Sequence, residues 1–379
     1  MSTDKTTDKP RYELLDGLRG VAAVLVIWYH FFEGFATSPT DQMMNHGYLA
    51  VDFFFVLSGF VLGYAYDDRW HRDMNARKFM LRRVIRLHPL VILAVLLGAV
   101  AYWLQGSVRW DGTPMPVSAL LQALILGMFL IPVLPGMRAD VRGNGEMFPL
   151  NGPSWSLFFE YIGSILYALV LHRLSVRALR CVMAVSAAAL AASAVCDMSG
   201  AYHTGMGWTL AGYGFVGGFL RLSFSFSAGL LLCRTFRPRR IRGAFWICSA
   251  MLALIMACPY VGGPEPSMLN GIYDSICTLL LFPAIVYIGA CGTTTDAFST
   301  RTCSFLGALS YPVYIVHYPL MYMFYAWVWA APAERTFSAV WPVCTVLFAG
   351  IILMAWIAYR CYDLPVRRRL TSLILKRAR

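Results

Sequence analysis

Long apolar segments recur along almost the whole chain, and this repetition limits the folds that are open to it. Of the 379 residues, 58% are hydrophobic and only 14% are charged, and the mean hydropathy is +0.59. Apolar segments of about 20 residues are typical of helices that cross a lipid bilayer. The sequence therefore predicts an all-α, polytopic membrane protein that has the bilayer as its partner, rather than a set of soluble domains.

The apolar segments predict ten transmembrane helices, at residues 18–35, 48–66, 89–104, 155–171, 179–196, 210–232, 244–260, 272–290, 305–329 and 337–359. Residues 117–135 are also apolar, but a full crossing there would place the later arginine-rich loops on the opposite side from the earlier ones. Pro132, Pro135 and the short length favour a re-entrant or interfacial segment instead. No polar stretch is long enough to bury a core of its own, so we expect one membrane-embedded domain over residues 1–379.

The net charge of +12 comes from Lys and Arg clusters between the apolar segments. Seven of these residues lie within 69–86, and others lie at 234–242. By the positive-inside rule these loops face the cytoplasm, together with the polar start, residues 1–13, and the basic tail, residues 366–379. Loop charges of this kind explain the positive net charge, so no nucleic-acid partner is expected. The ten cysteines lack metal-ligand spacing, so no metal site is expected.

The first apolar segment carries Arg19 at its start and His30 deep inside it. Their spacing of eleven residues is roughly three helical turns, which places both side chains on one helix face, about 16 Å apart along the axis. An ionisable side chain at membrane depth is costly and therefore indicates function. His30 is the candidate general base, because the pKa of imidazole is close to physiological pH. The alternative is a core histidine that bonds a neighbouring helix.

Two carboxylates are expected at the same membrane level as His30. Asp52 lies near the outer end of the second segment, and Glu160 lies a turn or two below the outer end of the segment 155–171. Either carboxylate could orient the imidazole or bind a hydroxyl substrate, and each alone could also be structural. The sequence does not divide these roles between them.

Several arginines mark the predicted cytoplasmic edge of the membrane. Arg83 and Arg86 are one helical turn apart, Arg82 is adjacent, and Arg19 lies at the same edge. Guanidinium groups bind phosphate through paired hydrogen bonds, so these four residues could form an anion site. The alternative is that they only fix the topology of the chain.

Three further residues are candidates for lining a cavity above these arginines. Ser58 precedes a glycine, and two small residues there would admit a thin ligand, although close packing of another helix explains them equally well. Tyr314 and His317 are one turn apart on a late segment and share a helix face. His317 is expected to fix helix packing by hydrogen bonding, because nearby prolines leave backbone groups unpaired.

Five ordered blocks resemble the signature of the family-3 membrane acyltransferases. The blocks are Leu15-Asp16-Gly17-Leu18-Arg19-Gly20 with His30, Val51 to Phe60, Phe79 with Arg82, Arg83, Arg86 and Pro89, Trp155-Ser156-Leu157 with Glu160, and Ser310-Tyr311-Pro312 with Tyr314, His317 and Pro319. The resemblance covers residues 12–365. It implies a bacterial inner-membrane enzyme of about ten helices that moves an acyl group, usually acetyl from acetyl-CoA, to a hydroxyl of a sugar or similar acceptor. It also implies that the functional positions are Arg19, His30, Arg83 and Arg86.

These observations lead to one hypothesis for the reaction. CoA phosphates bind Arg19, Arg83 and Arg86, and the pantetheine arm brings the thioester to His30, about 16 Å away. The expected acceptor is an envelope or exported polysaccharide or its lipid-linked repeat unit, acetyl-CoA is the donor substrate, and no cofactor is bound permanently. Direct attack and a covalent intermediate both remain open. The alternatives are acylation of a small secreted metabolite and a proton-coupled transporter or flippase, and a homo-oligomer is compatible with either.

Overall fold

The computed structural model describes residues 12–72, 74–294 and 296–375. Within these ranges the chain is helical, and strand pairing is limited to three isolated bridges. The predicted all-α fold is therefore confirmed. Most of the predicted polar start, residues 1–13, and the last four residues of the predicted tail lie outside the described residues.

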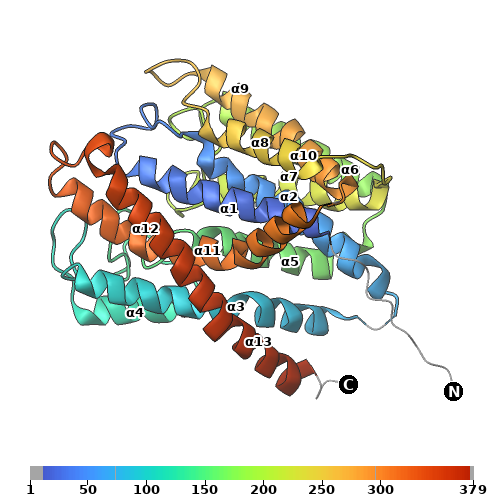
Figure 1. Ribbon diagram of the computed structural model, residues 1–379, viewed down its shortest axis with the longest axis horizontal. Helices are drawn as coiled ribbons and strands as arrows, with labels where there is room; N and C mark the ends of the chain where they lie inside the picture. Colours follow the sequence, from blue (N-terminus) through green and yellow to red (C-terminus); the bar gives the residue numbers. More distant parts are fainter. Residues whose placement is uncertain (1–11, 73, 295, 376–379) are drawn as a thin grey trace.

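Most helices run side by side along the long axis of the molecule (Figure 1). In chain order they are α1 (Glu13–Glu33), α2 (Ala50–Tyr66), α3 (Ala76–Leu104), α4 (Val117–Met128), α5 (Ser154–Leu169), α6 (Val176–Val195), α7 (Gly214–Thr235), α8 (Ala244–Ala257), α9 (Met268–Ile276), α10 (Phe282–Cys291), α11 (Ala297–Trp329), α12 (Phe337–Ile357) and α13 (Leu364–Leu370). Short π-helical segments join α9 to α10 and α12 to α13.

Several helices begin at polar N-cap residues. The side chains of Asn75, Ser175 and Asp296 each accept a hydrogen bond from the backbone N–H three residues further on. These bonds satisfy N–H groups that the first helical turn leaves unpaired, and they fix where α3, α6 and α11 begin.

Each of the ten predicted segments coincides with a helix. Among the described residues, seven helical segments are long and apolar enough to cross a membrane, namely α1, α2, α3, α6, α7, the continuous α9 and α10, and the continuous α12 and α13. The other three are α5, α8 and α11. Helix α4 has only 12 residues, fewer than a full crossing needs, and packs against α3. The re-entrant or interfacial path of 117–135 stays a prediction. The chain is a multi-pass membrane protein.

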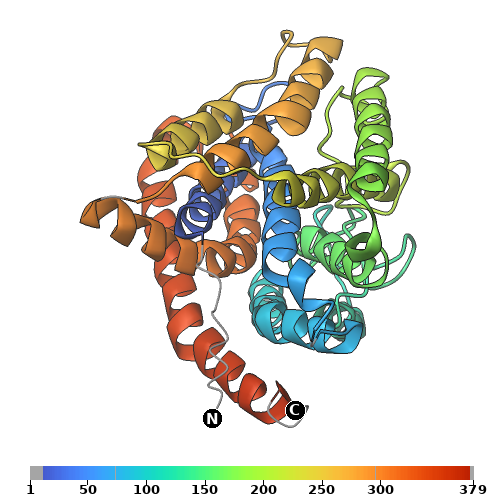
Figure 2. The same ribbon diagram turned by 90° about the vertical axis from the view of Figure 1, so that its right-hand side faces the viewer.

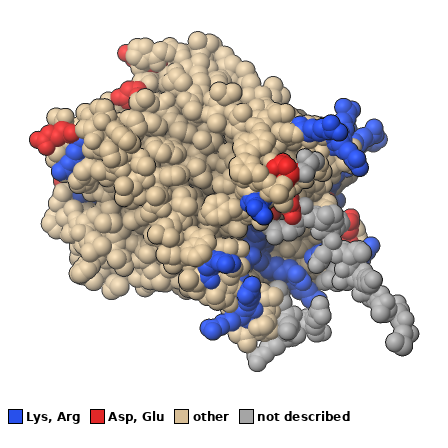
Figure 3. All heavy atoms as spheres, viewed as in Figure 1, with Lys and Arg blue, Asp and Glu red and all other residues tan. Residues whose placement is uncertain are grey.

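The outward faces of the bundle are apolar midway along its long axis, and most exposed Lys and Arg side chains lie toward one end (Figure 3). Val185, Leu254 and Val346 are 71%, 75% and 73% exposed, and exposed apolar surface of this extent suits hydrocarbon rather than water. Lys and Arg gather mainly where α1 and α3 begin, on the right of Figure 3. We call this the basic end, and it includes the arginine-rich stretches 69–86 and 234–242.

Helices α1 and α2 lie near the centre of the bundle (Figure 2), and each meets one partner very closely. A Cβ atom on Gly20 of α1 would lie 2.3 Å from the carbonyl oxygen of Leu306 on α11. A Cβ atom on Gly59 of α2 would lie 2.1 Å from the carbonyl oxygen of Phe226 on α7. Only glycine permits such approaches. Gly59 therefore serves helix packing, which was one of the two explanations for the small residues beside Ser58.

Candidate active site

Two cavities lie beside α1, one toward each end of the helix. The narrow cavity is nearer the basic end and has a volume of about 90 Å³. The wide cavity is nearer the opposite end and has a volume of about 490 Å³, within the usual range of small-molecule sites. Val51 and Tyr314 line both cavities. The two cavities therefore adjoin at these residues.

His30 lines the wide cavity in the last turn of α1. Because the helix ends at Glu33, His30 lies nearer the helix end than the predicted segment 18–35 indicated. Its Nδ1 is 2.7 Å from Oε2 of Glu33, and the Tyr325 hydroxyl donates to the same oxygen at 2.8 Å. An ionised carboxylate only accepts, so in the neutral imidazole Nδ1 carries the proton and Nε2 has the lone pair. The pair has the arrangement of an imidazole base held by a carboxylate.

Asp52 and Glu160, the two carboxylates expected beside His30, have other partners. Asp52 is fully buried and accepts hydrogen bonds from Arg221 at 2.7 and 3.1 Å, and it lines neither cavity. Glu160 lines the narrow cavity, where it pairs with Arg83. The structure therefore brings neither carboxylate to the imidazole, because both face arginines.

Sequence reasoning missed two charged residues for which signals existed. Glu33 follows His30 by three residues, so the two side chains share a helix face, and a search for partners on other helices overlooks it. Arg221 lies inside the predicted segment 210–232, where an ionisable side chain should have been singled out by the same rule as His30. Arg221 lines the wide cavity and is fully buried.

Three of the four arginines predicted to form an anion site line the narrow cavity. Arg19 donates from Nε to Ser310 at 2.8 Å, and its Nη2 is 3.4 Å from a carboxylate oxygen of Asp16. Arg83 is buried and is held by its ion pair with Glu160. Both charges are therefore partly neutralised by neighbouring carboxylates.

Arg86 is the third arginine of the narrow cavity, and it makes no hydrogen bond or ion pair to another residue of the described chain. Ser58 lines the same cavity and donates to Glu160 at 3.2 Å. Arg82 is exposed and lines neither cavity, because it lies on another face of α3. Arg86 is therefore the guanidinium best placed to receive an anion.

Tyr314 and His317 on α11 have different surroundings. The Tyr314 hydroxyl lies 2.7 Å from Oγ of Ser156. His317 is fully buried and lines neither cavity; its ring stacks on that of His30 with centroids 5.3 Å apart. Nδ1 of His317 donates to the Val313 carbonyl at 3.1 Å. The prediction that His317 lines the cavity and contacts the donor is therefore wrong, because its ring is enclosed by packing against His30.

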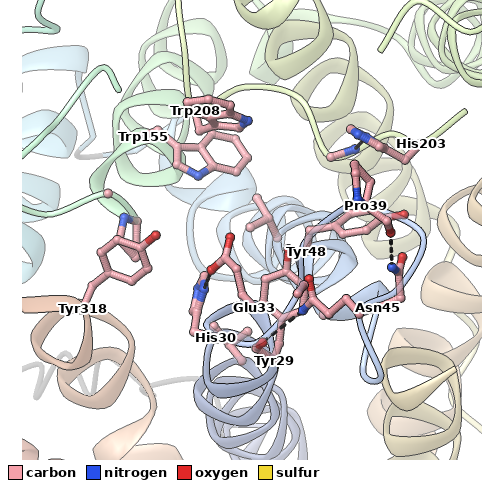
Figure 4. A pocket seen from close by; sticks show the side chains of 18 of the residues that line it. Tyr29, His30, Glu33, Pro39, Asn45, Tyr48, Trp155, His203, Trp208 and Tyr318 are labelled. Carbon is pink, nitrogen blue, oxygen red and sulfur yellow. Dashed lines mark hydrogen bonds and ion pairs between the residues drawn. The ribbon is translucent and has the colours of Figure 1, made fainter. Parts of the chain in front are cut away.

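Aromatic side chains form much of the remaining wall of the wide cavity. Figure 4 shows Trp155 and Trp208 on the side opposite His30 and Glu33, with Tyr318 to one side. Trp208 is 41% exposed and Trp155 is half-buried, so both have ring surface available to a ligand. Trp208 comes from the loop before α7, where no sequence motif indicated a functional residue.

His203 lies on another side of the same cavity (Figure 4). Burial lowers the pKa of His203 from 6.5 to about 4, so the imidazole is neutral near physiological pH. The backbone N–H of Gly205 donates to Nδ1 at 3.0 Å. Nε2 therefore carries the proton and is a hydrogen-bond donor.

A family model described as an acyltransferase domain matches residues 12–360. The chain therefore belongs to this family of membrane acyltransferases, and the resemblance of the five sequence blocks is confirmed. Because the members of this family transfer acyl groups, the chain is an acyltransferase. This class of activity decides against the transporter or flippase alternative.

Two of the following three relatives have names that state an acyl-transferring activity. The chain is 36% identical to "Protein 2 in picA locus" of Rhizobium radiobacter over 194 residues, which are 48% of this chain and 95% of that protein. It is 28% identical to the "Putative membrane-bound transacylase BcsY" of Komagataeibacter xylinus over 321 residues, 82% of this chain and 73% of that protein. The chain is also 32% identical to the "Peptidoglycan O-acetyltransferase OatA" of Listeria monocytogenes over 83 residues. These are 21% of this chain and 12% of that protein. No solved structure matches the chain.

Proposed function

We propose that the chain is a bacterial inner-membrane O-acyltransferase. It moves an acyl group, in our proposal acetyl, from cytoplasmic acyl-CoA to a hydroxyl of an envelope or exported polysaccharide or its lipid-linked repeat unit. The observation that carries this proposal is the junction of an arginine-lined narrow cavity with a wide cavity that contains the His30–Glu33 pair.

In this proposal the donor enters from the basic end. The phosphates of CoA bind guanidinium groups, and Arg19 lies about 16 Å along α1 from His30, a length that an extended pantetheine arm can span. The narrow cavity suits a thin chain better than a sugar ring. The positive-inside rule supports a cytoplasmic basic end, where acyl-CoA is available.

His30 acts as the general base in this proposal. Nε2 takes the proton of the acceptor hydroxyl as its oxygen attacks the thioester carbonyl carbon. Glu33 accepts from Nδ1–H and stabilises the imidazolium that forms. When the C–S bond breaks, the sulfur keeps the electron pair and takes the proton from the imidazolium, which releases CoA.

The wall of the wide cavity supports a carbohydrate acceptor. Indole faces pack against the C–H faces of sugar rings, while polar groups at the edges bind hydroxyls. Trp155 and Trp208 supply the aromatic surface, and His203 supplies a neutral donor. The Listeria relative is named a peptidoglycan O-acetyltransferase, which agrees with a glycan acceptor.

The two arginines of α3 that line the narrow cavity, Arg83 and Arg86, should differ in their effect on donor binding. Arg86→Ala should weaken binding of acyl-CoA by about 10- to 100-fold, as expected for the loss of a hydrogen bond to a charged group. Arg83→Ala leaves Glu160 without its partner and should mainly reduce the amount of folded protein. Calorimetric titration with CoA checks both variants, with exposed Arg82→Ala as the matched control. Unchanged CoA affinity in Arg86→Ala would mean that this residue only fixes topology.

Removing an indole from the wide cavity should weaken binding of the acceptor but not of acyl-CoA. Trp208→Ala should raise the KM for a carbohydrate acceptor about 10-fold, which corresponds to a stacking loss of ~1.4 kcal/mol, and leave the KM for acyl-CoA unchanged. Trp103→Ala is the control, because Trp103 is exposed and lines neither cavity. Equal acceptor KM values for wild type and Trp208→Ala would argue against this wall as the acceptor site.

Mass spectrometry of envelope glycans tests the proposed acceptor. Glycans from cells with the gene should carry acyl groups that are absent from cells without it, and His30→Ala should fail to restore them. Acyl groups found instead on a small secreted molecule would support the metabolite alternative and overturn the polysaccharide assignment.

A further inference from the structure

The junction of the two cavities has one polar side chain in the described part of the chain. Val51 and Tyr314 are the two residues that line both cavities, and Val51 offers only methyl groups. Tyr314 is buried, and its ring packs edge-on against Phe54 with centroids 5.4 Å apart. The Tyr314 ring is therefore held in place at the point where the cavities adjoin.

The proposed function places the thioester carbonyl at this junction. The donor arrives through the narrow cavity and the base lies in the wide one, so the reacting carbon must lie where they adjoin. Attack by the acceptor oxygen forms a C–O bond and moves the π electron pair onto the carbonyl oxygen. An oxyanion in a site shielded from water needs a hydrogen-bond donor aimed at it.

The Arg221 guanidinium, the cationic donor of the wide cavity, already has partners. The Arg221 guanidinium lines the wide cavity, but it donates to Asp52 and to the carbonyls of Tyr48 and Met206. The five hydrogen bonds to these groups fix the position of the guanidinium. It adds positive charge near the site but is not free to turn toward a ligand.

Ser156 shows where the Tyr314 proton points. The Ser156 hydroxyl donates its single proton to the Pro153 carbonyl at 3.0 Å, so it accepts at 2.7 Å from the Tyr314 hydroxyl. Rotation about the Tyr314 C–O bond can redirect this proton without moving the ring. The Tyr314 hydroxyl then donates to a negatively charged oxygen instead of the neutral Ser156 hydroxyl. Hydrogen bonds to charged acceptors are stronger.

We propose that Tyr314 donates a hydrogen bond to the thioester carbonyl oxygen as negative charge develops on it. Tyr314 keeps its proton throughout. When the tetrahedral intermediate collapses, the C=O bond re-forms, the C–S bond breaks with the electron pair on sulfur, and Tyr314 returns to Ser156. Because the bond strengthens only as charge develops, it lowers the barrier without tightening ground-state binding. This inference rests on the proposed function.

Tyr314→Phe tests the proposal because it removes only the hydroxyl. We expect kcat to fall about 10²- to 10³-fold, the usual effect of losing one oxyanion donor, with the KM values for acyl-CoA and acceptor unchanged. Ser156→Ala removes the same resting hydrogen bond but leaves the phenol, so it should keep kcat near the wild-type value. Tyr161→Phe is the matched control, because the Tyr161 hydroxyl is buried without a hydrogen-bond partner among the described residues and lines neither cavity.

Equal losses of kcat in Tyr314→Phe and Ser156→Ala would show that the bond between them is only structural, and would overturn the inference. Wild-type kcat in Tyr314→Phe would overturn it as well. Calorimetric CoA binding by each variant confirms that the protein measured is folded. The proposed function is tested separately by the wild type: if wild-type protein transfers no acyl group from acyl-CoA to any hydroxyl, that function fails whatever the variants do.

Discussion

Replacing His30 with glutamine should lower kcat for acyl transfer by about 10²- to 10⁴-fold, the usual contribution of a general base. Glutamine is polar and of similar length, but its amide does not accept a proton at physiological pH. His30 lines the wide cavity with Nδ1 held by Glu33, so the function lost is that of Nε2. The rate is measured as acceptor-dependent release of CoA thiol from membranes that contain the protein.

Two controls separate loss of the base from loss of the fold. Binding of CoA to His30→Gln should be unchanged, because the arginines of the narrow cavity lie at the other end of α1. His317→Gln removes the stacked imidazole but leaves the base, so its loss of kcat should be much smaller. Full turnover by His30→Gln would remove His30 from the role of base.

Replacing Glu33 with glutamine should also lower kcat, by about 10²-fold or more, because changing the carboxylate of a histidine pair to an amide can cost up to ~10⁴. The amide can still contact Nδ1, but it brings no charge to stabilise the imidazolium and it can reverse the tautomer. The effect should appear in kcat rather than in the KM for acyl-CoA. The same thiol-release assay measures it.

Tyr325→Phe and Asp52→Asn are the control variants for Glu33→Gln. Tyr325→Phe removes the second hydrogen bond to Glu33 but leaves the charge, so its effect should be smaller. Asp52→Asn removes the negative charge that neutralises the buried Arg221 guanidinium, which costs about 3–5 kcal/mol and should reduce the yield of folded protein. A larger loss of kcat per folded molecule in Asp52→Asn than in Glu33→Gln would contradict the assignment of Glu33.

Much of the fold follows from the sequence because helices in a bilayer must be long, apolar and internally hydrogen-bonded. For this reason all ten apolar segments coincide with helices, and the short apolar run at 117–135 contains a short helix. The first and last residues of the helices were less predictable. Helix α1 begins at Glu13, five residues before the apolar segment does, because a helix continues into polar residues at the membrane edge.

Contacts within one helix follow from residue spacing, including the overlooked one between His30 and Glu33, whereas contacts between two helices do not. The spacing of Arg19 and His30 already placed both on one face of α1. The pairing of Asp52 with Arg221 and of Glu160 with Arg83 depends on how α2, α7, α5 and α3 are rotated against one another. That rotation is set by close contacts such as the one at Gly59, which the sequence does not reveal.

A sided assay in sealed vesicles tests whether the two cavities form one path across the membrane. Purified protein is inserted with its basic end outward, a carbohydrate acceptor is trapped inside, and acyl-CoA is added outside. Mass spectrometry should find acylated acceptor inside the vesicles and free CoA outside. Acylation that requires donor and acceptor to be on the same side of the membrane would contradict a path through Tyr314 to His30.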